Sequence, residues 1–273
     1  MKKLLAAVPV HAALLVGAAV ALTPLVWMVA ASIMKPGEAS EFPPPFLPSS
    51  PVLTNYVELF TRLSLGRALA NSLLVAGATT LGVLLLNSMA GYAFAKLRFP
   101  GRDRLFSVLV GALVIPAQVS MLPLFLMLRS AGLINTYVGA ILPGTAGIIG
   151  IFLIRQFAQA IPDDLLHAAR LEGASEFLIY RRIVLPILKP VLATLGIVTF
   201  LATWNDFVWP LVILTDESRY TLPVALASLI GEHVPDTELM MAGAVITVLP
   251  VLVLFLLLQK QYVEGITLGG VKE

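Results

Sequence analysis

Six long apolar segments recur along the chain, and their length indicates whether it folds in water or in a lipid bilayer. They lie near residues 8–33, 68–94, 106–128, 136–158, 187–213 and 239–258. A hydrocarbon core about 30 Å thick is crossed by roughly 20 apolar residues of α-helix, the structure that pairs its own backbone groups. Only 12% of the residues are charged, against about 25% in ordinary soluble domains. The sequence therefore predicts an all-α polytopic membrane protein with six transmembrane helices in a single transmembrane domain, residues 1–273.

The first apolar segment also has features of a cleaved signal peptide. Lys2 and Lys3 precede it, and Val29-Ala30-Ala31 before Ser32 resembles a small-residue cleavage site. Its apolar run is much longer than the roughly 7–15 residues of a signal-peptide core. We therefore expect a retained first span, with cleavage as the alternative.

The lysines and arginines lie mainly on one side of the predicted membrane. With the N-terminus inside, thirteen lie on the inner side: Lys2, Lys3, Lys96, Arg98, Arg102, Arg104, Arg155, Arg170, Arg181, Arg182, Lys189, Lys260 and Lys272. The outer side holds Lys35, Arg62, Arg67, Arg129 and Arg219. Because cytoplasmic loops retain positive charge, this asymmetry supports six spans with both termini in the cytoplasm.

Prolines and amides mark local features of the outer loops and spans. Residues 34–66 include a proline-rich stretch that is typical of an extended strap, followed by a short amphipathic helix near residues 55–60. In the third span, Pro116 and Pro123 predict kinks. In the second span we expect the polar side chains to join helices by hydrogen bonds, namely those of Asn71, Asn87 and Ser88.

The longest inner loop, residues 159–186, carries an unusual density of polar residues. Pro162 followed by Asp163 and Asp164 suits the start of a helix, because proline fits the first turn and carboxylates favour the positive end of the helix dipole. Gly173 suits a left-handed helix stop. A short first helix is therefore predicted between these positions.

Small residues recur on this first helix, and a second helix follows it. Ala168 and Ala169 predict a small, flat patch that another surface can approach. Ser175 can cap a second helix through Val184, which Leu185-Pro186 would close. The hairpin can be an amphipathic anchor, with Arg181 and Arg182 on lipid phosphates, or a docking element for a soluble partner. The residues alone leave both interpretations open.

One spacing in this loop resembles a known motif. Ala168-Ala169, three residues, Gly173, nine residues, Ile183, one residue and Leu185-Pro186 resemble the E-A-A loop of permease subunits of bacterial ABC importers. The resemblance extends over essentially the whole chain, through NSLLVA, GYAFAKLRFPGR, TWNDFVWPLVIL, MAGAV and the terminal GITLGGVK. These segments together resemble the second, six-span permease of maltose-type and multiple-sugar-type systems.

The resemblance implies an ABC importer permease-type bundle in the bacterial plasma (inner) membrane. The partners would be a second permease subunit, two cytoplasmic ATP-binding-cassette subunits and an extracytoplasmic sugar-binding protein. This chain would bind no cofactor, with ATP and Mg on the partner ATPase. The loop would be the coupling helix region, and its candidate ATPase-coupling residues are His167, Ala168, Ala169, Glu172, Gly173, Ile183, Leu185 and Pro186.

Three further features bear on this function. His167 stands where the family has a glutamate; it could offer only a neutral hydrogen bond, and Asp163 or Asp164 one turn earlier could supply the negative charge instead. In the tail, the resemblance suggests a second ATPase contact through Gly269, Gly270 and Lys272, against a frayed end. In the fifth span, the candidates for pathway lining are Trp204, Asn205 and Asp206, against interfacial anchoring or capping of a broken helix.

Other functional classes lack the residues they need. The chain has no G-x-x-x-x-G-K-[ST] phosphate loop, its three histidines lie in different topological regions, and no basic cluster has the interleaved aromatics of a nucleic-acid surface. An enzyme, a metal site and nucleic-acid binding are therefore not expected. The rivals that stay open are an importer of glycerol phosphate or another small polar solute, and an ion-driven secondary transporter.

Overall fold

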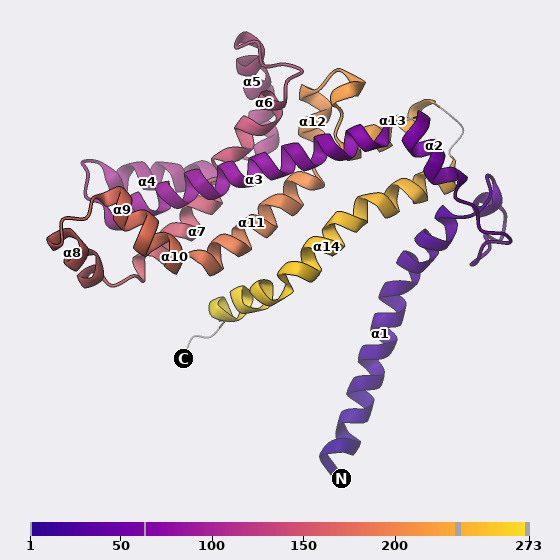
Figure 1. Cartoon of the computed structure of the whole chain (residues 1–273), viewed down its shortest axis with the longest axis horizontal. Coiled ribbons are helices and arrows are strands. Elements are labelled where there is room, and N and C mark those ends of the chain that lie inside the picture. The colour runs from indigo at the N-terminus through magenta and orange to yellow at the C-terminus, as the bar shows by residue number, and fades with distance from the viewer. Residues whose placement is uncertain (1, 63, 233–235, 271–273) are drawn as a thin grey trace. The chain divides into compact units, whose positions relative to one another are not determined.

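The computed structural model describes residues 2–62, 64–232 and 236–270, and within these ranges the regular elements are all helical (Figure 1). The chain divides into two compact units, Met1–Gly66 with Ala225–Leu252, and Arg67–Val224 with Val253–Glu273. Each unit is held together by contacts among its own residues. The all-α prediction is confirmed.

Four helical stretches are long and apolar enough to cross a membrane: Pro9–Ser32, Leu65–Lys96, Tyr137–Gln159 and Thr237–Leu257. They correspond to the predicted first, second, fourth and sixth spans. The predicted third span falls on a helix pair that is bent by 107°, Arg102–Val114 with Ala117–Ser130. A second pair, Glu176–Ile187 with Lys189–Trp204, is bent by 78°, and its second arm lies in the predicted fifth span. The described residues thus give four spans, or six if each bent pair is one span.

The first unit holds α1 (Lys2–Ser32), the 3₁₀ turn η1 (Glu38–Ser40), α2 (Thr54–Arg62) and the beginning of α14 (Thr237–Gly270). Helix α2 contains the short helix predicted near residues 55–60. The connection between α1 and α2 is held by carboxylates, since Glu38 accepts hydrogen bonds from the backbone N–H groups of Lys35 and Ser49. Glu238 of α14 accepts another from Ala39 at 2.6 Å, so this strap is tied to the start of α14.

The second unit is built on α3 (Leu65–Lys96) and α7 (Ile148–Gln159), with the other elements around them. In chain order these are α4 (Arg102–Gly111), η2 (Ala112–Val114), α5 (Ala117–Ser130), α6 (Tyr137–Ile141), η3 (Leu142–Thr145), α8 (Asp163–Leu171), α9 (Glu176–Ile179), the π-turn η4 (Tyr180–Val184), α10 (Leu185–Ile187), α11 (Lys189–Trp204), α12 (Val208–Ile213) and η5 (Glu217–Arg219). Helix α13 (Leu222–Glu232) begins in this unit, and its residues from Ala225 onward belong to the first unit.

Helices α3 and α7 approach so closely that one contact needs glycine. A Cβ atom built on Gly91 would lie 2.6 Å from Cγ2 of Ile154 and 3.0 Å from the backbone nitrogen of Arg155. Ile154 belongs to a buried cluster that also takes in Leu166, Tyr180 and Val191. The core of this unit therefore continues from the long helices into the 159–186 loop.

The polar residues of α3 join helices, as their positions in the second span predicted. Asn71 donates hydrogen bonds to the carbonyls of Ser218 and Tyr220, and Asn87 donates one to the carbonyl of Gly147. Ser88 shares a 2.7 Å hydrogen bond with the hydroxyl of Tyr180. Because each partner is far away in the sequence, these bonds fix tertiary rather than local structure.

Proline acts more strongly in the third span than predicted. Helix α4 and η2 end before Pro116, which caps α5, and the axis turns by 107° there. Proline lacks the N–H that would continue the ladder and pushes its preceding residue toward extended backbone, as Ile115 shows with ψ of 117°. Pro123 lies inside α5 without ending it.

Candidate functional site

The 159–186 loop folds as the helical hairpin that its sequence predicts. Helix α8 begins after Pro162 with Asp163 and Asp164 in its first turn, and the chain turns back at Gly173, whose φ is +82°. A left-handed φ of this kind costs glycine little and other residues more, which explains a glycine here. Ser175 caps α9 by accepting a hydrogen bond from the N–H of Leu178. In Figure 1, α8 lies on a projecting loop and α9 lies beside the end of α3, where Glu176 meets Tyr92.

The prediction that Leu185-Pro186 closes the second helix is wrong. The helix runs on through α9, the π-turn η4 and α10, and the direction changes only at Leu188, between Glu176–Ile187 and Lys189–Trp204. Pro186 lies in the first turn of α10. The π-turn just before Pro186 shifts the hydrogen-bond pattern of the backbone, so the helix can continue past a residue that donates no N–H.

Lys96, the last residue of α3, fastens the start of the hairpin. Its ammonium donates hydrogen bonds to the carbonyls of Ile161 at 2.6 Å and Gln159 at 3.3 Å, and to Oδ1 of Asp163 at 2.7 Å. The lysine side chain is only 6% exposed. The hydrogen bond and positive charge of Lys96 hold the pKa of Asp163 below its usual value.

Tyr92, one helical turn earlier on α3, fastens the second arm. Its hydroxyl donates a 2.8 Å hydrogen bond to Oε2 of Glu176, and Arg170 of α8 donates to both oxygens of the same carboxylate. The paired Glu176 raises the pKa of the Arg170 guanidinium. A single carboxylate therefore connects α3, α8 and α9.

Ser88, Tyr92 and Lys96 are spaced four residues apart, so they lie on one face of α3. Ser88 reaches Tyr180, Tyr92 reaches Glu176 and Lys96 reaches Asp163. Sequence analysis singled out Ser88 but missed the other two. Their regular spacing on a helix ending at the same membrane face as the loop was the available signal.

The predicted coupling residues divide between the two sides of the hairpin. His167, Ala168, Glu172, Gly173 and Pro186 are exposed, and Ile183 and Leu185 are half-buried. Ala169 is only 9% exposed and belongs to the core, so the two alanines do not form the shared flat patch expected from the sequence. The reason is geometric, because consecutive helix residues point about 100° apart.

Two large apolar side chains that the sequence analysis did not select are exposed on the hairpin. Leu171 at the end of α8 is 90% exposed, and Phe177 on α9 is 63% exposed. Large apolar side chains that stay exposed on a projecting hairpin are candidates for a surface that another protein covers. The hairpin thus combines a rigid attachment to α3 with an uncovered apolar tip.

The three pathway candidates lie at a break between α11 and α12. Trp204 is 1% exposed and stacks on Phe200, so its ring is enclosed by this chain. Asn205 is exposed, and Oδ1 of Asp206 accepts hydrogen bonds from the N–H groups of Val208 and Trp209. Asp206 therefore caps α12, which is the structural alternative considered for it.

The tail residues are only partly described. Helix α14 continues to Gly270, so Gly269 and Gly270 have helical backbone, whereas Lys272 lies outside the described residues. Across the described ranges, no three His, Asp or Glu side chains gather where they could hold a metal ion.

Comparison with known proteins assigns the chain to a family. Residues 87–267 match the family described as binding-protein-dependent transport system inner membrane component. An arabinooligosaccharides transport system permease of Halalkalibacterium halodurans is 38% identical over 228 residues, covering 83% of this chain and 82% of that protein. A melibiose/raffinose/stachyose import permease of Bacillus subtilis is 36% identical over 221 residues, covering 80% of each.

The fold agrees with this assignment. A solved bacterial ABC transporter involved in the import of the acidic polysaccharide alginate superimposes with a TM-score of 0.84, covering 95% of this chain and 97% of that one at 22% identity. The chain belongs to the binding-protein-dependent transport system inner membrane components, the multi-pass permease subunits of ABC importers.

Proposed function

We propose that this chain is a permease of an ATP-driven sugar importer, and that its α8–α9 hairpin is the docking element for a cytoplasmic ATP-binding-cassette subunit. The observation that carries the docking role is the combination of exposed Leu171 and Phe177 with the anchors from Lys96 and Tyr92. The sugar class rests on the oligosaccharides named for the two relatives.

Transmission of movement follows from the attachments of the hairpin. A displaced α8 pulls on α3 through Asp163 and Lys96, and a displaced α9 pulls on it through Glu176 and Tyr92. Buried Leu166 and Ile179 pack in the same cluster as Ile154 of α7 and Val191 of α11. A well-packed element of this kind moves as a body, so ATP-driven closure of the partner would tilt the attached spans.

The complex that this proposal requires has several subunits. A second permease would complete the pathway, two ATPase subunits carrying ATP and Mg would bind the loops, and an extracytoplasmic binding protein would deliver the sugar. Both termini would be cytoplasmic. Within the pathway, Asn205 is the better candidate for contact with the solute, because Trp204 is enclosed and Asp206 is engaged as a cap.

His167 replaces the family glutamate at an exposed position of α8. Asp163 is already engaged by Lys96, whereas Asp164 is exposed and lies one turn before His167 and Ala168. We therefore assign the anionic contact with the ATPase to Asp164. In this account Asp164→Asn weakens binding of the ATPase subunit, and His167→Glu restores it in the double variant. Unchanged binding in Asp164→Asn would contradict the assignment.

The tail is the second proposed ATPase contact. Deletion of residues 269–273 is expected to weaken recovery of the ATPase with the purified permease, whereas undiminished recovery would support the frayed-end interpretation. The deletion leaves the α8–α9 hairpin intact, so any loss reports on the tail itself.

The sugar is identified by stimulation of ATP hydrolysis in proteoliposomes. The chain, its permease and ATPase partners, and the binding protein are reconstituted, and the binding protein is loaded in turn with an arabinooligosaccharide, a raffinose-type sugar or glycerol 3-phosphate. Stimulation by an oligosaccharide supports the proposal. Stimulation by glycerol 3-phosphate alone, or uptake driven by an ion gradient without ATP, would contradict it.

A further inference from the structure

His167 is exposed on α8 among the charged side chains of the hairpin. Asp163 and Asp164 precede it by four and three residues, so both carboxylates lie one helical turn before the imidazole. Arg170 follows three residues later, but its guanidinium is paired with Glu176 of α9. The charged neighbours of His167 on its own helix are therefore mainly carboxylates.

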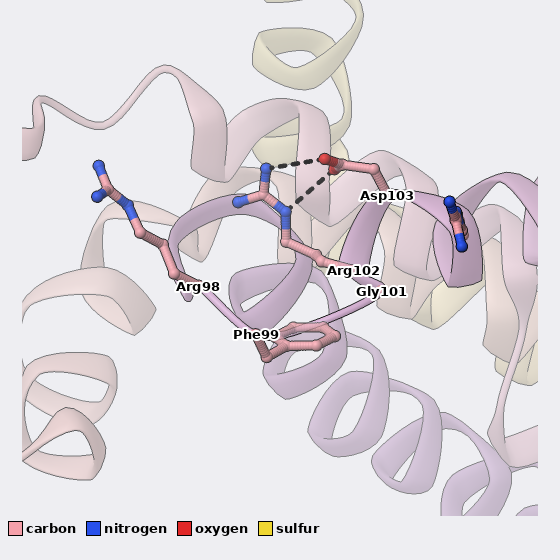
Figure 2. Close-up of a pocket in the computed structure, with 6 residues that line it drawn as sticks. Arg98, Phe99, Gly101, Arg102 and Asp103 are labelled. Atoms are coloured by element: carbon pink, nitrogen blue, oxygen red, sulfur yellow. Dashed lines mark hydrogen bonds and ion pairs between the residues drawn. The ribbon is translucent and has the colours of Figure 1, made fainter.

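Asp163 takes its positive partners from within the chain. Lys96 donates a 2.7 Å hydrogen bond to Oδ1 of Asp163, and this contact is the main reason that the pKa of the carboxyl is lowered. Smaller attractions come from His167 and Arg98. In Figure 2, Arg98 extends from the α3–α4 connection in a direction away from Arg102 and its carboxylate partner. The imidazole therefore interacts electrostatically with the charged groups at the base of the hairpin.

Protonation of His167 changes the charge of the surface that the ATPase would meet. Histidine is the side chain whose charge ordinarily changes between about pH 5 and 8. A protonated imidazole places a positive charge one turn from Asp164, the exposed carboxylate assigned above to the ATPase contact. This charge repels a positive group on the partner and attracts Asp164 to itself. The glutamate of the family motif stays negative over the same range of pH.

We propose that protonation of His167 weakens docking of the ATPase subunit on the α8–α9 hairpin, so that this contact is regulated by pH. The inference rests on the proposed docking role of the hairpin and adds its regulation. Two like charges about 4–6 Å apart in water weaken association about three- to fivefold. The affinity of the ATPase subunit should therefore fall about three- to fivefold from about pH 7.5 to about pH 5.5.

The test measures the affinity of the ATPase subunit for the purified permease pair that contains the full chain. Wild type, His167→Gln and His167→Glu are compared from about pH 5.5 to 8. The ratio of wild-type to His167→Gln affinity cancels titrations on the ATPase itself, and it should fall about three- to fivefold toward acid pH. The ratio of His167→Glu to His167→Gln should stay nearly constant. His11→Gln, which removes an exposed histidine from the first unit, is the matched control and should keep the wild-type profile.

Calorimetry gives a second readout, because a proton that opposes docking is released when docking occurs. At about pH 6.5, binding is measured in two buffers with different ionisation enthalpies. The wild type should release a fraction of a proton that His167→Gln does not release. The same pH profile in wild type and His167→Gln, without a difference in proton release, would overturn the inference.

Failure of the docking role itself gives a different result. Leu171→Ser and Phe177→Ser remove the exposed apolar side chains of the hairpin without changing its charge. If neither lowers the affinity at about pH 7.5, where histidine is ordinarily neutral, the hairpin does not dock and the inference falls with that role. If either lowers it while His167→Gln keeps the wild-type pH dependence, docking stands and regulation through His167 is excluded.

Discussion

Replacing Lys96 by methionine removes the fastening between α3 and the start of the hairpin while keeping an aliphatic side chain of similar length. The 2.6 Å hydrogen bond to the carbonyl of Ile161 comes from a charged donor that is only 6% exposed. Such a bond contributes about 1.5–3 kcal/mol, and loss of the donor leaves the carbonyl without this partner.

The two other contacts of Lys96 add little to stability. The bond to the carbonyl of Gln159 is 3.3 Å long and exposed, so it adds at most about 0.5 kcal/mol. The Asp163 carboxylate is exposed to solvent, which screens its attraction to Lys96, so this small contribution is left out of the sum. We therefore expect Lys96→Met to lower the free energy of unfolding by about 2–3 kcal/mol.

Two measurements check this expectation. Unfolding in mixed micelles, titrated with sodium dodecyl sulfate, gives the loss of stability. Stimulation of ATP hydrolysis by loaded binding protein in the reconstituted complex should fall further than basal hydrolysis, because α8 would no longer move with α3. Arg181→Met, which removes an exposed charge from the same loop, is the control. A Lys96→Met variant with unchanged stability and full stimulation of ATP hydrolysis would refute the attachment of the hairpin to α3 through Lys96.

Three further variants test neighbouring contacts. Tyr92→Phe removes one hydrogen bond from the half-exposed Glu176 but leaves those from Arg170, so we expect a loss of about 0.5–1.5 kcal/mol in the same unfolding titration; an unchanged midpoint would contradict this. Gly91→Ala should destabilise the chain by about 1–3 kcal/mol through the clash with Ile154, whereas Gly77→Ala, with open space around its Cβ, should be neutral or stabilising; equal effects would refute the close approach. Since the pKa of Asp163 is held below its usual 3.8, its contribution is present above that pH and lost as the pH falls through the lowered pKa. The stability difference between the wild type and Asp163→Asn should therefore be constant from about pH 5 to 7 and shrink below about pH 4, and a constant difference throughout would exclude this ionisation.

The parts of the hairpin that sequence predicts are those that short-range chemistry determines. The start after Pro162, the turn at Gly173 and the cap from Ser175 each depend on residues within one helical turn, and each is confirmed. The continuation of the second helix through Pro186 was not predicted, because proline ordinarily ends a helix. Here a π-turn precedes it and lets the helix continue.

The anchors from α3 depend instead on long-range packing. Lys96 and Asp163 are 67 residues apart, and Tyr92 and Glu176 are 84 apart. No local preference encodes such a pair, although the four-residue spacing from Ser88 to Lys96 marks one helix face. The inward position of Ala169 has the same origin, because which face of α8 is covered depends on the core formed with α7 and α11.

Docking of the hairpin on the ATPase is tested most directly by cysteine cross-linking. The chain contains no cysteine, so Ala168→Cys and Leu171→Cys each introduce a unique exposed thiol, and Ala169→Cys introduces a buried one on the same helix. Each variant is assembled with the ATPase subunit and treated with a short bifunctional thiol reagent against a panel of single cysteines on the ATPase. We predict adducts from positions 168 and 171 and none from 169. Absence of adducts from both exposed positions across the whole panel, in complexes that still assemble, would contradict docking at this hairpin.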